Sequence, residues 1–176
     1  MRLRIMTANG GKRKVLIWEG VGIPFLVVAG FLLHFLYEWT GSSVIVAWFC
    51  PVNESVWEHL KLGFWGVVFF SLIEYWFVRK EINNFLIAKA AGILLLQLFI
   101  LIVCYACKSI FHSQSVIIDI ISFIIGVIIC QILSYRILTA GKYPATVPAI
   151  SAVFLLVHGI LLIVFTFAPP KAEMWF

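Results

Sequence analysis

The chain contains 176 residues, of which 63% are hydrophobic and only 12% are charged, and it carries a formal net charge of +5. Soluble domains are about half apolar and about one quarter charged, so this composition, with a mean hydropathy of +1.08, excludes an ordinary water-soluble domain. The basic residues lie between apolar runs rather than in one patch, which argues against nucleic-acid binding and favours a role in membrane topology.

Five apolar stretches are long enough to cross a bilayer, which takes about 20 residues in a helix. The polar breaks between them are short, and none has the length of a separate domain. The sequence therefore predicts an all-α integral membrane helical bundle that forms a single transmembrane domain over residues 1–176. The predicted spans are residues 17–37, 56–78, 85–106, 116–135 and 147–167.

The first predicted span carries Gly30, His34 and Glu38 at intervals of four residues, so the three share one face of a helix. Its start is basic, but its apolar run is too long for a signal peptide and no small-residue cleavage site follows, so we expect it to be retained. The apolar segment 42–50 comes next and is too short to cross. We expect this segment to lie along the outer surface or to form a re-entrant piece.

The second predicted span begins with "PVNESVWEHLKLGFW", in which four ionisable residues lie close together. Ser55 and Glu58 fit a capping box, which explains part of this polarity. Helical spacing places Glu54, Glu58 and Lys61 on one stripe, where Lys61 can pair with a glutamate. His59 lies on another stripe with Ser55 and two glycines, and small residues favour a face that packs against neighbouring helices.

Other ionisable residues lie near span ends. Glu74 is close in sequence to Arg79 and Lys80, so we expect an ion pair at the membrane interface. Lys89 has a side chain long enough to reach the membrane surface from within the third span. The same span ends with "CYAC", a C-x-x-C sequence compatible with thiol–disulfide chemistry. This signal is weak, because small apolar cysteine is common in such helices.

The fourth and fifth predicted spans also carry polar faces. Asp119 and Ser122 share a face in the fourth, and Ser151 and His158 share one in the fifth. Polar groups within a membrane are costly and usually face the interior of a bundle or a wet cavity. Four of the five helices can therefore contribute polar groups to one interior. For His158 alone, a hydrogen-bonded interior histidine is favoured over a metal ligand.

Lysine and arginine near the span ends predict the orientation. Only Lys108 and Lys171 lie near span ends on one side, whereas nine basic residues lie on the other. We therefore expect a cytoplasmic N-terminus and an external C-terminus. The nine are Arg2, Arg4, Lys12, Arg13, Lys14, Arg79, Lys80, Arg136 and Lys142.

These positions predict a polar site at the outer mouth of the bundle, where the first helix ends and the second begins. His34 and His59 lie at similar depths below the ends of their helices, so we expect them to converge with the glutamates of the 54–58 turn. The ligand or metal candidates are His34, Glu38, Glu54, Glu58, His59 and Asp119, and the secondary candidates are Asn53, Trp57, Lys61, Ser151 and His158.

Several functions are compatible with this site. Mixtures of histidine and carboxylate suit zinc or another divalent metal, a proton relay, or a general acid–base pair. The leading hypothesis is a protein that binds or transports a small solute or ion through an outward-facing cavity. The alternatives are a zinc-dependent intramembrane hydrolase and a structural or partner-binding subunit whose polar groups only join helices. The expected partner in each case is the lipid bilayer.

Three sequences carry a resemblance to a known family: "LHFLYEW" at 33–39, "PVNESVWEHLKL" at 51–62 and "FTFAPPK" at 165–171. The chain resembles, over nearly its whole length, an uncharacterised family of small polytopic bacterial membrane proteins, mostly from Firmicutes and classed as a domain of unknown function. The string "NESVWEHLKL" is the most specific part. The resemblance implies a multi-pass protein of the bacterial cytoplasmic membrane and implies no activity, substrate or cofactor.

A fainter similarity concerns Asn53, Glu54, Trp57 and His59, which are similar to an N-E-T…N-I-W-T-H string of progestin/adipoQ-type receptors. Those receptors are membrane proteins with a zinc site. This chain departs from them in having five predicted spans rather than seven and in lacking a late H-x-x-x-H. The similarity supports zinc hydrolase chemistry by analogy only.

Overall fold

The computed structural model describes residues 2–111 and 116–169, and over these residues the regular structure is entirely helical. Lys171, which enters the topology argument, lies outside the described residues. The predicted all-α architecture with five long helices is confirmed. The elements are α1 (Arg2–Trp39), the short 3₁₀ helix η1 (Val46–Trp48), α2 (Val56–Val78), α3 (Phe85–Phe111), α4 (Val116–Leu138) and α5 (Thr146–Phe167).

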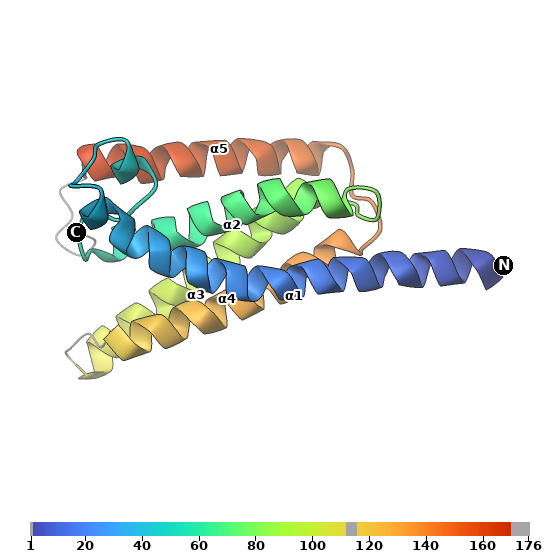
Figure 1. Ribbon diagram of the computed structural model, residues 1–176, viewed down its shortest axis with the longest axis horizontal. Coiled ribbons are helices and arrows are strands. Elements are labelled where there is room, and N and C mark those ends of the chain that lie inside the picture. The colour runs from blue at the N-terminus through green and yellow to red at the C-terminus, as the bar shows by residue number, and fades with distance from the viewer. Residues whose placement is uncertain (1, 112–115, 170–176) are drawn as a thin grey trace.

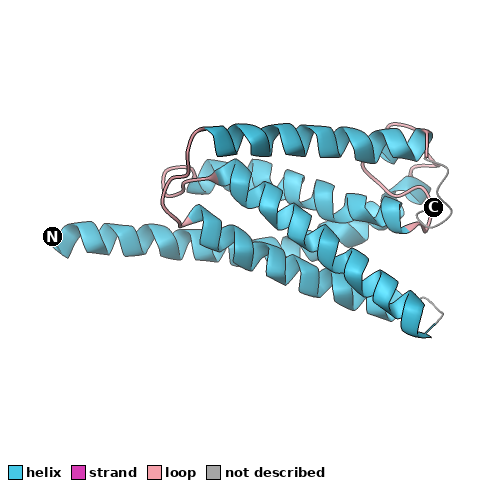
Figure 2. Cartoon of the chain, turned by 180° about the vertical axis from the view of Figure 1, so that it is seen from behind, coloured by secondary structure: helices cyan, strands magenta, loops and turns pink. Residues whose placement is uncertain are grey.

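The helices run back and forth along one long axis (Figure 1). α1 packs against α2 and α4, α2 also contacts α3, and α5 lies over α2 and α3. We call the end that holds the connection from α1 to α2 the α1–α2 end, and the opposite end the α2–α3 end. The N-terminal part of α1 projects past the other helices at the α2–α3 end (Figures 1 and 2).

All five helices are long and apolar enough to cross a membrane. α5 shows why the surroundings must be apolar, because Ile150, Val153 and Leu156 are each more than 60% exposed along one side. Such a surface would favour aggregation in water, whereas lipid covers it without cost. The chain is therefore a multi-pass membrane protein.

The predicted spans match the helices at their centres more closely than at their ends. The bounds of α2 agree with the prediction, and α5 begins at Thr146, directly before its expected start. α1 begins at Arg2, well before the predicted start at residue 17, and α3 and α4 continue past their predicted ends. Hydropathy marks only the apolar part of a helix, and lysine and arginine extend a helix readily beyond it.

Close packing of α3 on α4 depends on small residues. A Cβ atom added at Gly126 would lie 2.6 Å from Cδ1 of Leu96, and one at Gly92 would lie 2.9 Å from Sγ of Cys130. Small residues let two helices approach closely enough for van der Waals contact to hold them together in lipid. The core that results includes the buried side chains Leu26, Phe70, Ile93, Leu96 and Val127.

Segment 40–55 covers the α1–α2 end of the bundle. Its 3₁₀ helix η1 is held from below by Lys61, whose Nζ donates to the carbonyl oxygens of Ala47 at 2.9 Å and Cys50 at 3.1 Å. Val46 and Phe49 pack on a buried cluster that includes Leu33 and Leu62. Because the segment is fixed to α2 in this way, the residues that follow it reach the start of α2 in a defined position.

Candidate functional site

The start of α2 is fixed by side-chain caps. Ser55 is the N-cap, and its side chain accepts a hydrogen bond from the backbone N–H of Glu58. The expected capping box is only half formed, because the Glu58 carboxylate accepts from the N–H of Val52 at 3.0 Å instead of from Ser55. The Ser55 N–H donates to Oδ1 of Asn53 at 2.9 Å. These bonds place Glu54 beside the first turn of α2.

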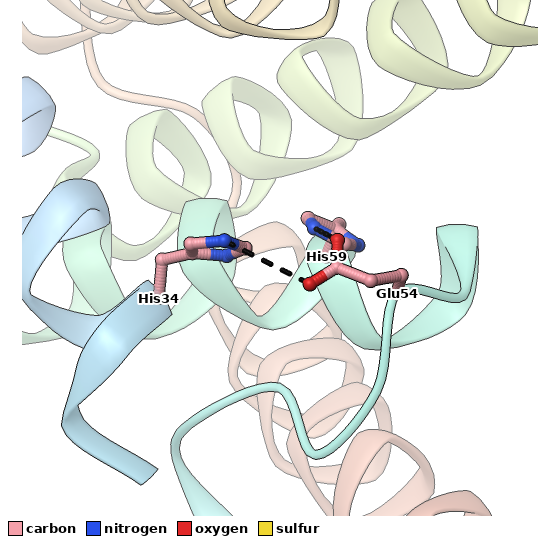
Figure 3. Close-up of side chains that lie close together, drawn as sticks. All are labelled: His34, Glu54 and His59. Atoms are coloured by element: carbon pink, nitrogen blue, oxygen red, sulfur yellow. Dashed lines mark ion pairs between the residues drawn. The ribbon is translucent and has the colours of Figure 1, made fainter. Parts of the chain in front are cut away.

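Three of the six main candidates come together there: His34 from α1, Glu54 from the turn and His59 from α2 (Figure 3). One ligand atom from each lies within 4.8 Å of the other two. Glu54 lies between the histidines, with Oε2 at 3.3 Å from Nε2 of His59 and Oε1 at 3.9 Å from Nε2 of His34. We call these three residues the His/Glu cluster.

Hydrogen bonding fixes the state of the His59 ring. Its Nδ1 lies 2.8 Å from the carbonyl oxygen of Ser55, and a carbonyl can only accept, so Nδ1 carries a hydrogen and donates it. In the neutral ring, Nε2 then has only a lone pair, which points at the Glu54 carboxylate. Two acceptors at 3.3 Å repel one another unless a proton or a metal ion lies between them. A cation between the two groups would relieve this repulsion.

The His/Glu cluster is open on one side. Each histidine side chain is 28% exposed, whereas the Glu54 side chain is 84% exposed. The histidines are therefore held within the bundle end, while the carboxylate forms the outer wall. A metal ion held by these three side chains would keep a coordination position free for water or for another ligand.

Glu58 and Lys61 do not belong to the cluster. They form a buried ion pair at 2.7 Å, and Oε1 of Glu58 also accepts from the Thr166 hydroxyl of α5 at 2.9 Å. The prediction that Glu58 lies together with the two histidines is therefore wrong. The cause is geometric, because Glu58 and His59 are adjacent on a helix and point in different directions. Glu58 instead joins α2, α5 and segment 40–55.

The remaining candidates lie apart from the cluster. Glu38 and Asp119 are exposed and are not among the described residues that gather around His34. Trp57 packs its ring on Phe165, and Ser151 donates to the carbonyl of Val147 within its own helix.

His158 lies between aromatic rings rather than in a hydrogen-bonded position. Its ring packs on Phe64 and Phe154, with centroids at 5.3 and 5.4 Å. Its Nε2 has no hydrogen-bond partner among the described residues, so the expected hydrogen-bonded interior histidine is wrong. The ring borders a shallow depression of about 360 Å³ on α5 that is otherwise lined by apolar side chains.

A second polar cluster lies near the α2–α3 end and is buried. Lys89 of α3 donates to Oε1 of Glu19 from α1 at 3.0 Å and forms an ion pair with Glu74 of α2. Ser134 of α4 donates to the same Glu19 oxygen at 2.6 Å. We call Glu19, Glu74 and Lys89 the buried triad, and each of its side chains is at most 4% exposed.

The buried triad corrects two expectations. Glu74 pairs with Lys89 rather than with Arg79 or Lys80, which are exposed. Lys89 does not extend to the surface, because two carboxylates inside the bundle attract its ammonium group. The sequence did carry a signal for this pairing. Glu19, Glu74 and Lys89 lie at corresponding ends of three predicted spans, and the charge of the lysine is opposite to that of the two glutamates.

No disulfide joins the four cysteines, all of which lie within the described residues. Cys104 and Cys107 of the C-x-x-C sequence form no disulfide in the structure. Burial raises the pKa of the Cys50 thiol to about 11, although the nearby Lys61 acts in the opposite direction. At neutral pH Cys50 therefore stays protonated, and it is a poor nucleophile and a poor metal ligand.

Comparison with known proteins agrees with the family resemblance of the sequence. No curated protein and no solved structure matches the chain. One family model matches it over residues 7–176. This match confirms the predicted membership of an uncharacterised family. The chain belongs to the family of unknown function DUF6512.

Proposed function

We propose that this membrane protein binds a divalent transition-metal ion, zinc foremost, with the His/Glu cluster, as a step in ion capture or transport. The observation that carries the proposal is the approach of three ligand atoms, from His34, Glu54 and His59, to within 4.8 Å of one another. Imidazole nitrogen and carboxylate oxygen are ligands that Zn²⁺ accepts in open, three-residue sites.

The distances support this choice of ion. In tetrahedral coordination with bonds of about 2.0–2.1 Å, the ligand atoms of zinc lie about 3.3 Å apart. His59 and Glu54 are already separated by 3.3 Å, and His34 and Glu54 by 3.9 Å. The ligand atoms of His34 and His59 lie within 4.8 Å of one another, and small side-chain rotations would bring all three atoms into this geometry. The bond from His59 Nδ1 to the Ser55 carbonyl orients the ring as second-shell partners do in metal sites.

We propose that this site lies on the outer face of the membrane. Lys12, Arg13 and Lys14 are exposed on α1 near the α2–α3 end, and Arg79 and Lys80 are exposed at the same end. Basic residues favour the cytoplasmic side, which supports an outward-facing α1–α2 end. Reporter fusions at the two termini test this arrangement, and a cytoplasmic reporter that is active at the C-terminus contradicts it.

Ion binding is favoured over hydrolysis by the surroundings of the cluster. A zinc hydrolase of this type uses a carboxylate beside the metal as general base. Glu58 is the carboxylate next to His59 in sequence, but Lys61, Thr166 and the N–H of Val52 occupy it. Hydrolysis by this site remains the second candidate, and a structural role is the third.

Calorimetric titration of the purified full-length protein with Zn²⁺ tests the proposal. We expect one zinc ion per chain and a loss of affinity of at least tenfold in each of His34→Ala and His59→Ala. His158→Ala is the matched control and retains binding, because its ring lies on α5 away from the cluster. Equal zinc affinity in all four proteins contradicts the proposal.

Reconstituted vesicles separate the candidate functions. Zinc flux that depends on His34 and His59 supports transport. Zinc-dependent cleavage of a lipid or peptide, without flux, supports the hydrolase. Stoichiometric zinc binding without either activity is compatible with ion capture or with a structural metal. A structural metal is indicated if the zinc-free protein has a much lower thermal stability.

A further inference from the structure

The buried triad has an unbalanced charge. If both carboxyl groups are ionised, Glu19 and Glu74 carry two negative charges against the single positive charge of Lys89. The other groups that face them are neutral: Ser134 and Gln131 from α4, and the thiol of Cys130. An uncompensated charge inside a membrane bundle is costly. The triad is therefore expected to bind one further positive charge.

Hydrogen bonds point to the same deficit. Lys89 has three N–H donors, and the groups around it are Glu19, Glu74 and Ser134. Ser134 gives its only hydrogen to Glu19, and the amide of Gln131 donates to the Glu19 backbone carbonyl at 3.0 Å. The local donors are thus used, yet three buried oxygens have neither a hydrogen-bond partner nor an ion-pair partner among the described residues. These are Oε2 of Glu19, Oε1 of Glu74 and Oε1 of Gln131.

We propose that the buried triad is a proton-binding site in which Glu19 and Glu74 share one exchangeable proton. The proton makes the cluster neutral while Lys89 stays charged, and it adds the donor that the cluster lacks. Both carboxyl groups contact the same ammonium, so one proton on either of them balances the charge of the whole triad.

A metal cation fits this position less well than a proton. The ammonium of Lys89 already lies between the carboxylates, 3.0 Å from Glu19 and paired with Glu74, so a second cation would be repelled. Hard cations also need about six or more oxygen ligands, which three unpartnered oxygens do not supply. A proton needs only one carboxyl oxygen.

The proton site and the His/Glu cluster are well separated along the same two helices, α1 and α2. On α1, Glu19 lies toward the α2–α3 end and His34 toward the α1–α2 end, and Glu74 and His59 are placed in the same way on α2. At 1.5 Å per residue, each separation along the helix axis is about 22 Å. The charge and hydrogen-bond arguments for the proton do not depend on the metal proposal, so either can fail alone.

Infrared spectroscopy of the full-length protein in lipid at pH 7 tests the proposal. A protonated carboxyl has a C=O stretching band that is distinct from carboxylate bands, and we expect intensity for about one such group per chain. Glu19→Gln and Glu74→Gln each leave one carboxylate facing Lys89, so each removes the band. Glu81→Gln is the control, because Glu81 is exposed, and it leaves the band unchanged.

The wild-type protein decides the question even if a variant does not fold. A band that disappears as pH is raised, while the helical content stays constant, supports an exchangeable proton. Absence of any protonated carboxyl at pH 7 overturns the proposal and makes the triad a fully ionised structural group. A band that persists in both glutamate variants overturns it as well.

Discussion

His34 and His59 face one another across the α1–α2 interface, with ring centroids 5.3 Å apart and 37° between the ring planes. They belong to consecutive helices, and the turn that joins these helices supplies Glu54 between them. Each histidine lies on a rigid helix, so the spacing of the two Nε2 atoms depends on helix packing. Only the carboxylate is on a loop.

Replacing Glu54 with glutamine should weaken zinc binding without unfolding the protein. The amide keeps the shape but loses the charge, so we expect the zinc affinity to fall at least tenfold. The side chain is 84% exposed, and substitutions at such positions usually change stability by about 0.5 kcal/mol or less. Calorimetric titration measures the first effect and thermal unfolding without zinc measures the second.

Glu38→Gln is the matched control for Glu54, because Glu38 is an exposed carboxylate at the end of α1 that carries His34. It should bind zinc like the wild type. Equal losses in the two variants would indicate general electrostatic attraction rather than coordination by Glu54.

Acidification should release zinc from the His/Glu cluster. A protonated imidazole has no lone pair for a metal, so protons and zinc compete for the same nitrogen atoms. We expect a weaker zinc affinity at pH 5.5 than at pH 7.5, and proton release when zinc binds in weakly acidic buffer. Titrations in buffers of different ionisation enthalpy measure that release. An affinity that does not change with pH would argue against histidine ligands.

Lys61 should hold segment 40–55 in place. Lys61→Met leaves Glu58 buried without its partner, and breaking such a pair typically costs about 3–5 kcal/mol. The double variant Glu58→Gln with Lys61→Met removes both charges and should be more stable than the single variant. Lys142→Met, at an exposed position, is the control. Chemical or thermal unfolding in detergent ranks the four proteins.

Cys50 reports on the same segment. Its thiol is buried and its pKa is raised to about 11, so labelling by a maleimide at pH 8 should be slow in the folded wild type. The thiolate forms only as pH approaches that value. In Lys61→Met the segment loses two anchoring bonds, so labelling should become faster despite the lost positive charge. The Cys50→Ser variant is the control. Any labelling that remains in it comes from the other cysteines and is subtracted.

Gly126→Ala should separate α3 from α4. The added Cβ would lie 2.6 Å from Leu96, and overpacking of this kind typically costs about 1–3 kcal/mol. Leu96→Ala should cost less stability in the Gly126→Ala chain than in the wild type, because the smaller side chain makes room for the added Cβ. Gly20→Ala is the control, because nothing lies within 4 Å of the new atom, and alanine favours the helix there. An equal cost of Leu96→Ala in both chains would place the strain elsewhere.

The sequence predicted the architecture because hydropathy reports directly on membrane-spanning helices. It also brought His34, Glu54 and His59 together, since a short connection forces the end of α1 and the start of α2 to one level. Helical spacing already pointed Glu58 and His59 in different directions, but it did not show which groups surround Glu58, because Lys61, Thr166 and Val52 come together only in the fold. Nor did it identify Glu19, whose partners Lys89 and Ser134 come from α3 and α4, far along the chain.

X-ray absorption spectroscopy at the zinc edge, on protein loaded with one equivalent of Zn²⁺, tests the central claim most directly. The account predicts only nitrogen and oxygen neighbours at about 2.0–2.2 Å, with the scattering of two imidazole rings, and loss of one ring in either His34→Ala or His59→Ala. A sulfur neighbour at about 2.3 Å would place the metal on the cysteines instead and contradict the account. A spectrum without imidazole would contradict it too.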